Sequence, residues 1–249
     1  MSEQHNLTQS PLVFVHGSGD SGRVWRLQIE HFGSQRAFAV DLPGHGQRPD
    51  TLPAEVTVLE YTQSLHDIVT QELQLQKPII VGHSLGGAIA LTMALEYRSE
   101  LAGIILVGTG ARLRVLPATL ADAKNTPEQA RLHLAKMAMA TTTAPSISQA
   151  VVQEQIPPGP TILHRDLAAC DVFDSMRKLH EISVPTLIIC GAEDALTPVK
   201  YSTYLHQHIQ GSDLHIIPNA GHYVMREQPQ AVNQVIETWL NKESSPSTH

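Results

Sequence analysis

Residues 78–88 read PIIVGHSLGGA, and this stretch places a serine at the tip of a sharp turn. The apolar, mostly β-branched residues 79–81 predict a buried strand, and residues 88–97 favour a helix. Ser84 lies between them, with a glycine two residues before it and another two residues after it. The backbone at such a tip is strained, so both neighbours must be small for strand and helix to approach each other. The stretch therefore predicts that Ser84 is a nucleophile; the alternative is an ordinary glycine-rich turn with an incidental serine.

Composition narrows the classes of partner. The chain has 249 residues, a net charge of −7 and no basic run, which argues against a nucleic-acid partner. No apolar run approaches the ~18 residues of a membrane span, and the first ten residues lack the apolar core of a signal peptide. Cys170 and Cys190 are far apart, in no metal-ligand spacing, and are expected to be buried free thiols. We therefore expect a cytoplasmic monomer or homodimer without metal or cofactor.

Strand and helix patterns alternate along most of the chain. Short apolar runs predict strands at 11–15, 37–40, 79–81, 103–108, 185–191 and 214–217. Helical patterns are found at 24–32, 58–75, 88–97, 199–209 and 229–240. Alternation of this kind is typical of a mostly parallel sheet with helices on both faces. The sequence predicts an α/β fold with about six strands, whose ligands bind at the carboxyl ends of the strands.

The alternation is interrupted between Thr109 and Ser183, where the pattern is helical only. Capping signals precede two helices, at Thr126 and at Ser146, and residues 161–179 are expected to form a third helix. We expect a helical insertion at 111–183 between two parts of one core, 1–110 and 184–242, followed by a disordered tail at 243–249.

A serine nucleophile needs a base, and the base needs an acid that orients it. Among 14 histidines, His222 is the preferred base because its loop directly follows the last predicted strand. Asp194, in the loop after the strand that ends near Cys190, is the preferred acid over its neighbour Glu193. The alternative role of Asp194, capping the next helix, is assigned to Thr197 instead. Asp41 also follows a strand and is the main rival, although a turn-stabilising role suits it better.

An acyl-transfer site also needs N–H donors for the developing oxyanion. One candidate is the backbone N–H of Leu85, which begins the helix after Ser84. The other is the backbone N–H of Ser18, in the glycine-rich loop after the first strand, unless that loop is only a flexible turn. His16 and His45 are expected to brace their own loops by hydrogen bonds.

Five blocks occur in an order that resembles the α/β-hydrolase superfamily: HGSG (16–19), DLPGHG (41–46), GHSLGG (82–87), PTLIICGAED (185–194) and PNAGH (218–222). The resemblance implies an α/β-hydrolase fold with Ser84, Asp194 and His222 as the catalytic triad. It also implies that Ser18 and Leu85 form the oxyanion hole and that the insertion is a helical cap over the site. Two features depart from the pattern: only ten residues precede the first strand, and Arg48 replaces a small residue after the second block. A serine at position 84 argues against haloalkane dehalogenases and epoxide hydrolases, which use aspartate there.

The leading hypothesis is a carboxylic-ester hydrolase that acts through an acyl-enzyme on small to medium apolar acyl groups. Flexible apolar surface for such groups is expected from Leu132, Met137, Met139, Leu163, Met176 and Met225, which otherwise belong to the core. No arginine cluster in the insertion demands an acidic substrate. The alternatives are a C–C bond hydrolase acting on a diketone or dienoate, and a small-molecule receptor built on the same fold.

Overall fold

A computed structural model describes residues 7–154 and 159–243. Its centre is one six-stranded sheet in the order β2-β1-β3-β4-β5-β6, in which every neighbouring pair is parallel. The strands are β1 (Leu12–Val15), β2 (Ala37–Val40), β3 (Ile79–His83), β4 (Gly103–Val107), β5 (Thr186–Gly191) and β6 (Asp213–Ile217). The predicted parallel sheet of about six strands is confirmed.

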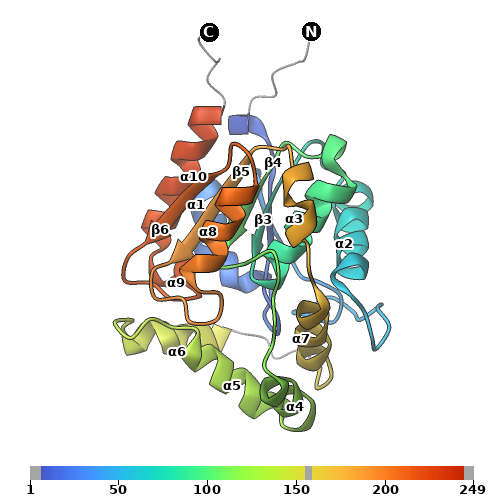
Figure 1. Cartoon of the computed structure of the whole chain (residues 1–249), viewed down its shortest axis with the longest axis vertical. Helices are drawn as coiled ribbons and strands as arrows, with labels where there is room; N and C mark the ends of the chain where they lie inside the picture. The colour runs from blue at the N-terminus through green and yellow to red at the C-terminus, as the bar shows by residue number, and fades with distance from the viewer. Residues whose placement is uncertain (1–6, 155–158, 244–249) are drawn as a thin grey trace.

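Helices cover both faces of this sheet (Figure 1). On one face lie α2 (Val58–Asp67), α3 (Leu85–Glu96) and α8 (Val199–His208), and on the other α1 (Arg26–Phe32) and α10 (Pro229–Glu243). Within β3, Ile80 packs into the first core cluster, whereas Ile79 and Val81 pack into the second. Both faces of the strand are buried, which explains its continuous apolar run. Shorter helices are η1 (Leu7–Gln9), η2 (Gly22–Trp25), the π-helix η3 (Ile68–Glu72), η4 (Arg98–Glu100), η5 (Met176–Glu181) and α9 (Val224–Glu227).

Between β4 and β5 the chain forms the helical segment, our name for α4 (Pro117–Asn125), α5 (Pro127–Met137), α6 (Pro145–Glu154), α7 (Ile162–Val172) and their connections. These four helices lie together at the end of the molecule opposite to the last turn of α10 (Figure 1). Where the segment leaves and rejoins the core, Arg112 and Asp174 form an isolated antiparallel bridge. No helix of the described residues is long and apolar enough to cross a membrane.

The local expectations about this segment hold only in part. Thr126 is the N-cap residue of α5, which begins at Pro127 as predicted, but its hydroxyl donates to the carbonyl of Asp122 in the preceding helix and makes no capping hydrogen bond. Helix α6 begins at Pro145, which places Ser146 inside the helix. The helix expected at 161–179 ends at Val172, because the N–H and hydroxyl of Ser175 both bind the carbonyl of Ala111 and turn the chain toward the core.

Glu243, which was expected to begin a disordered tail, is instead the last residue of α10. Residues 244–249 lie outside the described residues, as do Pro157 and Pro158 of the proline-rich break.

Candidate active site

Ser84 occupies a strained backbone conformation between β3 and α3, with φ 53° and ψ −114°. Few residues other than glycine adopt a positive φ, and such strain is concentrated at functional sites. A Cβ atom at Gly82 would lie 2.0 Å from the carbonyl oxygen of Gly86, and one at Gly86 would lie 2.4 Å from that of Val15. Only glycine fits at these two positions, as the turn geometry predicted.

His222 and Asp194 come together from the loops after β6 and β5. Nδ1 of His222 lies 2.8 Å from Oδ2 of Asp194, and both residues are buried. The other carboxylate oxygen, Oδ1, accepts hydrogen bonds from the backbone N–H groups of Leu196 (2.9 Å) and Thr197 (2.8 Å). Burial alone would raise the pKa of Asp194, but the charge of His222 and these donors lower it. Asp194 is therefore an anion that binds the Nδ1 edge of the His222 ring.

Thr197 is a residue of the site that sequence reasoning missed. Its hydroxyl donates to Oδ2 of Asp194 at 2.8 Å and lies 3.1 Å from Nδ1 of His222. The expected role, capping α8, is wrong because Pro198 is the N-cap and the Thr197 side chain points to the carboxylate instead. Proximity to Pro198 suggested a cap, and no local pattern indicated a carboxylate partner.

His83 packs against His222 and hydrogen-bonds to its backbone. Its Nε2 lies 3.0 Å from the backbone carbonyl oxygen of His222, and the two rings pack with centroids 4.6 Å apart. Burial, together with the neighbouring His222, lowers the pKa of His83 well below its usual value. His83 is thus neutral and donates a hydrogen bond to the loop that carries His222.

The loop after β1 passes beside Ser84. A Cβ atom at Gly17 would lie 3.1 Å from Cβ of Ser84, and Ser18 lines the same cavity as Ser84. Leu85 is the first residue of α3, so its N–H is one of the donors that a helix leaves without an intrahelical partner. The structure therefore places both predicted oxyanion donors next to Ser84.

One cavity of about 260 Å³ joins these residues to the helical segment. Ser84, His222, Ser18 and Thr197 lie on its core side. The helical segment contributes mainly apolar side chains, including Leu113, Leu134, Met137, Leu163, Leu167 and Cys170. This lining favours an apolar ligand that binds between the helical segment and Ser84.

The predicted lining is correct only in part. Met137 and Leu163 line the cavity, whereas Met225 is fully buried in the core and Leu132 is an exposed side chain. Met139 and Met176 pack against the edges of the two core clusters.

Two arginines also line the cavity, which the sequence did not indicate. Arg131 binds the Glu128 carboxylate through Nε (3.1 Å) and Nη2 (2.7 Å), and Arg114 donates to the carbonyl oxygen of Asp171 at 2.7 Å. Both guanidinium groups are thus held by neighbours within the helical segment.

Asp41 stabilises its own loop, as expected. Its two carboxylate oxygens accept from the backbone N–H groups of Gly22 (2.7 Å) and Gln47 (3.0 Å). Cys170 and Cys190 are buried free thiols, also as expected. Within residues 7–154 and 159–243, no group of three or more His, Cys, Asp or Glu side chains is arranged to hold a metal ion.

Comparisons with known proteins identify the family of the chain. A family model described as the alpha/beta hydrolase family matches residues 12–235. A solved thermophilic esterase is 35% identical with a TM-score of 0.81, over 93% of this chain and 90% of that one. The 3-oxoadipate enol-lactonase 2 of Acinetobacter baylyi is 27% identical over 93% of this chain and 88% of its own length. A pimeloyl-[acyl-carrier protein] methyl ester esterase of Neisseria meningitidis is 29% identical over 74% of this chain and 75% of its own.

Proposed function

This chain belongs to the alpha/beta hydrolase family, and on that premise we propose that it is a serine hydrolase of carboxylic esters. The proposed substrates carry small to medium apolar acyl groups, and the reaction proceeds through an acyl-enzyme. The observation that carries the proposal is the 2.8 Å contact of Asp194 with His222, which lines the same cavity as the strained Ser84. The similarity to esterases and to an enol-lactonase supports ester chemistry at the level of the family.

In the proposed reaction, Nε2 of His222 takes the proton from Oγ of Ser84 as this oxygen attacks the ester carbonyl carbon. Asp194 holds the ring with Nδ1–H toward its carboxylate and stabilises the imidazolium that forms. The imidazolium then gives its proton to the departing alcohol, which leaves the acyl group on Ser84. Water, deprotonated by His222, attacks this acyl-enzyme, and Ser84 recovers its proton as the acid departs.

We propose that the backbone N–H groups of Ser18 and Leu85 bind the carbonyl oxygen as its negative charge develops. Each donor of this kind is worth about 2.7–4 kcal/mol of barrier in acyl transfer. Their fixed positions support this role, because donors that need no reorientation cost nothing at the moment of reaction.

We also propose that residues 111–183 act as a cap that excludes water and selects the acyl group. Apolar side chains of α5 and α7 in the cavity support this role. Arg114 and Arg131 are held by Asp171 and Glu128, so the observations favour an uncharged acyl group over a carboxylate-bearing one.

The test is a series of p-nitrophenyl esters from acetate to palmitate, assayed on the wild type and on Ser84→Ala. We expect turnover with an optimum at short to medium chains, as a cavity of about 260 Å³ allows. Loss of Oγ should lower kcat by about 10⁶-fold, with the melting temperature retained. Turnover by the folded Ser84→Ala variant would contradict the assignment of the nucleophile. A wild type that turns over none of the esters, yet is stabilised by a ligand, would indicate a receptor instead.

A further inference from the structure

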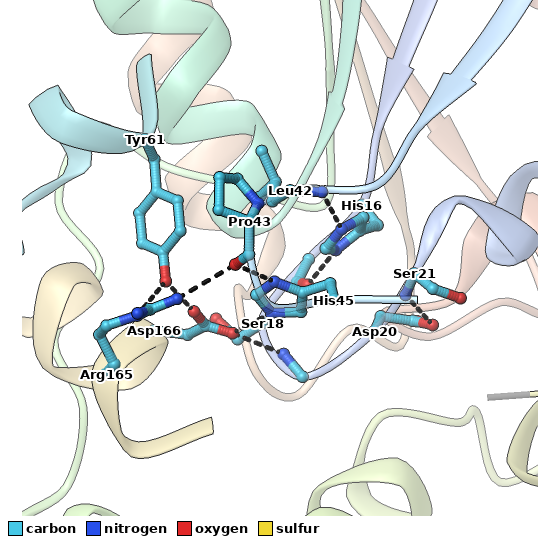
Figure 2. Close-up of polar contacts among 12 residues, drawn as sticks. His16, Ser18, Asp20, Ser21, Leu42, Pro43, His45, Tyr61, Arg165 and Asp166 are labelled. Carbon is cyan, nitrogen blue, oxygen red and sulfur yellow. Dashed lines mark hydrogen bonds and ion pairs between the residues drawn. The ribbon is translucent and has the colours of Figure 1, made fainter. Parts of the chain in front are cut away.

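Helix α7 carries two adjacent charged residues that are buried away from the catalytic groups. The side chain of Arg165 is 3% exposed and that of Asp166 is not exposed at all. Figure 2 shows both residues facing the loops that follow β1 and β2, together with Tyr61 of α2. Burying charges is costly, and a buried ion pair seldom stabilises a fold more than apolar side chains of equal size would. A contribution to stability is therefore a weak explanation for the burial of Arg165 and Asp166.

Asp166 gathers three donors from three different parts of the core. Its Oδ2 accepts the backbone N–H of Gly19 at 2.8 Å and lies 2.8 Å from Nε2 of His45. Its Oδ1 accepts a short hydrogen bond from the hydroxyl of Tyr61. The contact with Gly19 joins residues 147 positions apart and ends in the loop that contains Ser18.

The charges in this cluster balance. Nδ1 of His45 faces the carbonyl oxygen of Pro43 at 3.2 Å while its Nε2 faces Asp166, so both ring nitrogens meet acceptors (Figure 2). An imidazolium satisfies both acceptors, and it neutralises Asp166. Arg165 binds both oxygens of Asp50 at 2.9 and 3.0 Å. These four side chains therefore add no net charge beside the cavity in which an oxyanion would form.

Two successive peptide groups of the loop are held by side chains, one by His16 within the loop and the next by Asp166 of α7. The carbonyl oxygen of Gly17 lies 2.8 Å from Nδ1 of His16, and this carbonyl shares its peptide plane with the N–H of Ser18. Because Nε2 of His16 accepts the N–H of Leu42, Nδ1 carries the proton and donates. Burial lowers the pKa of His16 to about 4, so the ring stays neutral. Asp166 fixes the next peptide group through the N–H of Gly19.

Packing leaves this loop little freedom to adjust. Gly19 has φ 67°, and a Cβ atom there would lie 2.8 Å from Cδ1 of Leu163 in α7. Oγ of Ser18 lies 3.7 Å from Sγ of Cys170, which is about two turns after Leu163 in α7. The loop thus lies between the Ser84 turn on one side and α7 on the other.

We propose that Asp166 is a positioning residue for the oxyanion hole. By binding the Gly19 N–H it fixes the peptide after Ser18, so that the Ser18 N–H points toward the carbonyl oxygen of the substrate. The helical segment then contributes to the chemical step as well as to substrate selection. This inference rests on the proposed ester hydrolysis and on the role of Ser18 within it.

The test compares p-nitrophenyl butyrate with its thiono analogue, in which sulfur replaces the carbonyl oxygen. Sulfur is larger and a weaker hydrogen-bond acceptor, so an oxyanion hole favours the oxygen ester. The two compounds share their alkyl chain and leaving group, so changes in the pocket or in the folded fraction cancel in the ratio of their kcat/KM values. We expect Asp166→Leu, which is similar in size and offers the Gly19 N–H no acceptor, to lower kcat/KM for the oxygen ester by about tenfold or more and for the thionoester by less than about threefold.

Tyr61→Phe is the matched control. It removes a hydrogen bond to Oδ1 of Asp166 and one from Nε of Arg165 but leaves the contact with Gly19, so the ratio should stay at the wild-type value even if the melting temperature falls. If Asp166→Leu does not fold, Asp166→Glu replaces it, because one extra methylene displaces the loop and must also lower the ratio. An unchanged ratio in the Asp166 variant, or an equal fall in Tyr61→Phe, would overturn the inference alone. A wild type inactive on both esters would overturn the proposed function and this inference with it.

Discussion

Two buried carboxylates join the helical segment to the loops of the candidate site, and they do so from opposite sides. Asp166 belongs to the helical segment and reaches the loop of Ser18 through the Gly19 N–H. Glu227 belongs to α9 in the core and accepts the N–H groups of Gly221 and Ala140, each at 2.9 Å, and the hydroxyl of Thr143. Gly221 directly precedes His222, whose own N–H donates to the carbonyl of Ala138 at 2.6 Å. Each loop of the site is thus attached to the helices above it.

The two attachments differ in the chemistry of their donors. Asp166 has an ionisable partner, His45, whereas Glu227 is met by two backbone amides and a hydroxyl. The stability that each attachment contributes should therefore depend differently on pH. On the proposed mechanism, the attachment near His222 holds the acid–base groups, and the attachment near Ser18 holds the oxyanion donors.

Replacement of Asp194 tests this division of labour with the largest expected effect. Asp194→Asn removes the charge that orients His222 and should lower kcat by about 10⁴-fold, as expected when the base loses its correct tautomer. The measurement is kcat for a short p-nitrophenyl ester, with circular dichroism to verify the fold. Asp41→Asn is the control, because Asp41 binds only loop amides in the contacts described above. A larger loss of kcat in folded Asp41→Asn than in Asp194→Asn would mean that Asp41 is the acid.

Residues directly after strands could be assigned from the sequence, and the reason is physical. Parallel strands end at one edge of the sheet, so Ser84, Asp194 and His222 had to come near one another once the strands were recognised. Glycines around Ser84 added a local steric signal. The sequence nevertheless predicts the wrong role for Thr197. Its neighbour Pro198 is a sequence signal for a helix start, whereas its hydrogen bond to Asp194 has no sequence signal.

Asp166 and Glu227 could not be found in this way. Both lie on helices, where an isolated acidic residue is normally a solvated one. The partner of Asp166 is 147 residues away, and its burial depends on how α7 packs against two core loops. Only tertiary structure brings these groups together, so no periodicity or motif in the sequence indicates either attachment.

Substitution of Glu227 should lower the free energy of unfolding by an intermediate amount. Glu227→Gln replaces one acceptor oxygen by an NH₂ group, so at least one buried donor of Gly221, Ala140 or Thr143 loses its acceptor. An unsatisfied buried group of this kind costs about 1–3 kcal/mol, measurable by urea unfolding. Glu193→Gln is the matched control: Glu193 accepts from the exposed Thr141 at 2.9 and 3.2 Å, and its loss should change stability by no more than about 0.5 kcal/mol. Equal losses in both variants would show that burial of Glu227 is irrelevant.

The smallest expected effect is a change of thermal stability with pH, which should occur at the Asp166 attachment and not at the Glu227 attachment. Burial alone would lower the pKa of His45, but the Asp166 carboxylate raises it above the usual value. Two other titratable groups face His45: the Arg165 guanidinium, and the His16 ring, whose centroid is 4.7 Å from that of His45. A group with a raised pKa stabilises the fold fully below its unfolded pKa, about 6.5 for histidine, and this contribution is lost as pH rises through the folded value. Burial would also raise the pKa of Asp166, but His45 lowers it, so Asp166 loses its contribution only at acidic pH.

The difference in melting temperature between the wild type and His45→Gln should therefore be largest near pH 5.5–6 and narrow toward pH 9. We expect it to narrow by about 2–4 °C, the shift that roughly 1 kcal/mol produces in a chain of this size. The difference between the wild type and Glu227→Gln should stay constant over the same range, because amide and hydroxyl donors do not titrate there. If the His45→Gln difference is equally constant, His45 is not an imidazolium at neutral pH. The charge of Asp166 would then be uncompensated beside the proposed oxyanion hole, and the two attachments would not differ as their donors imply.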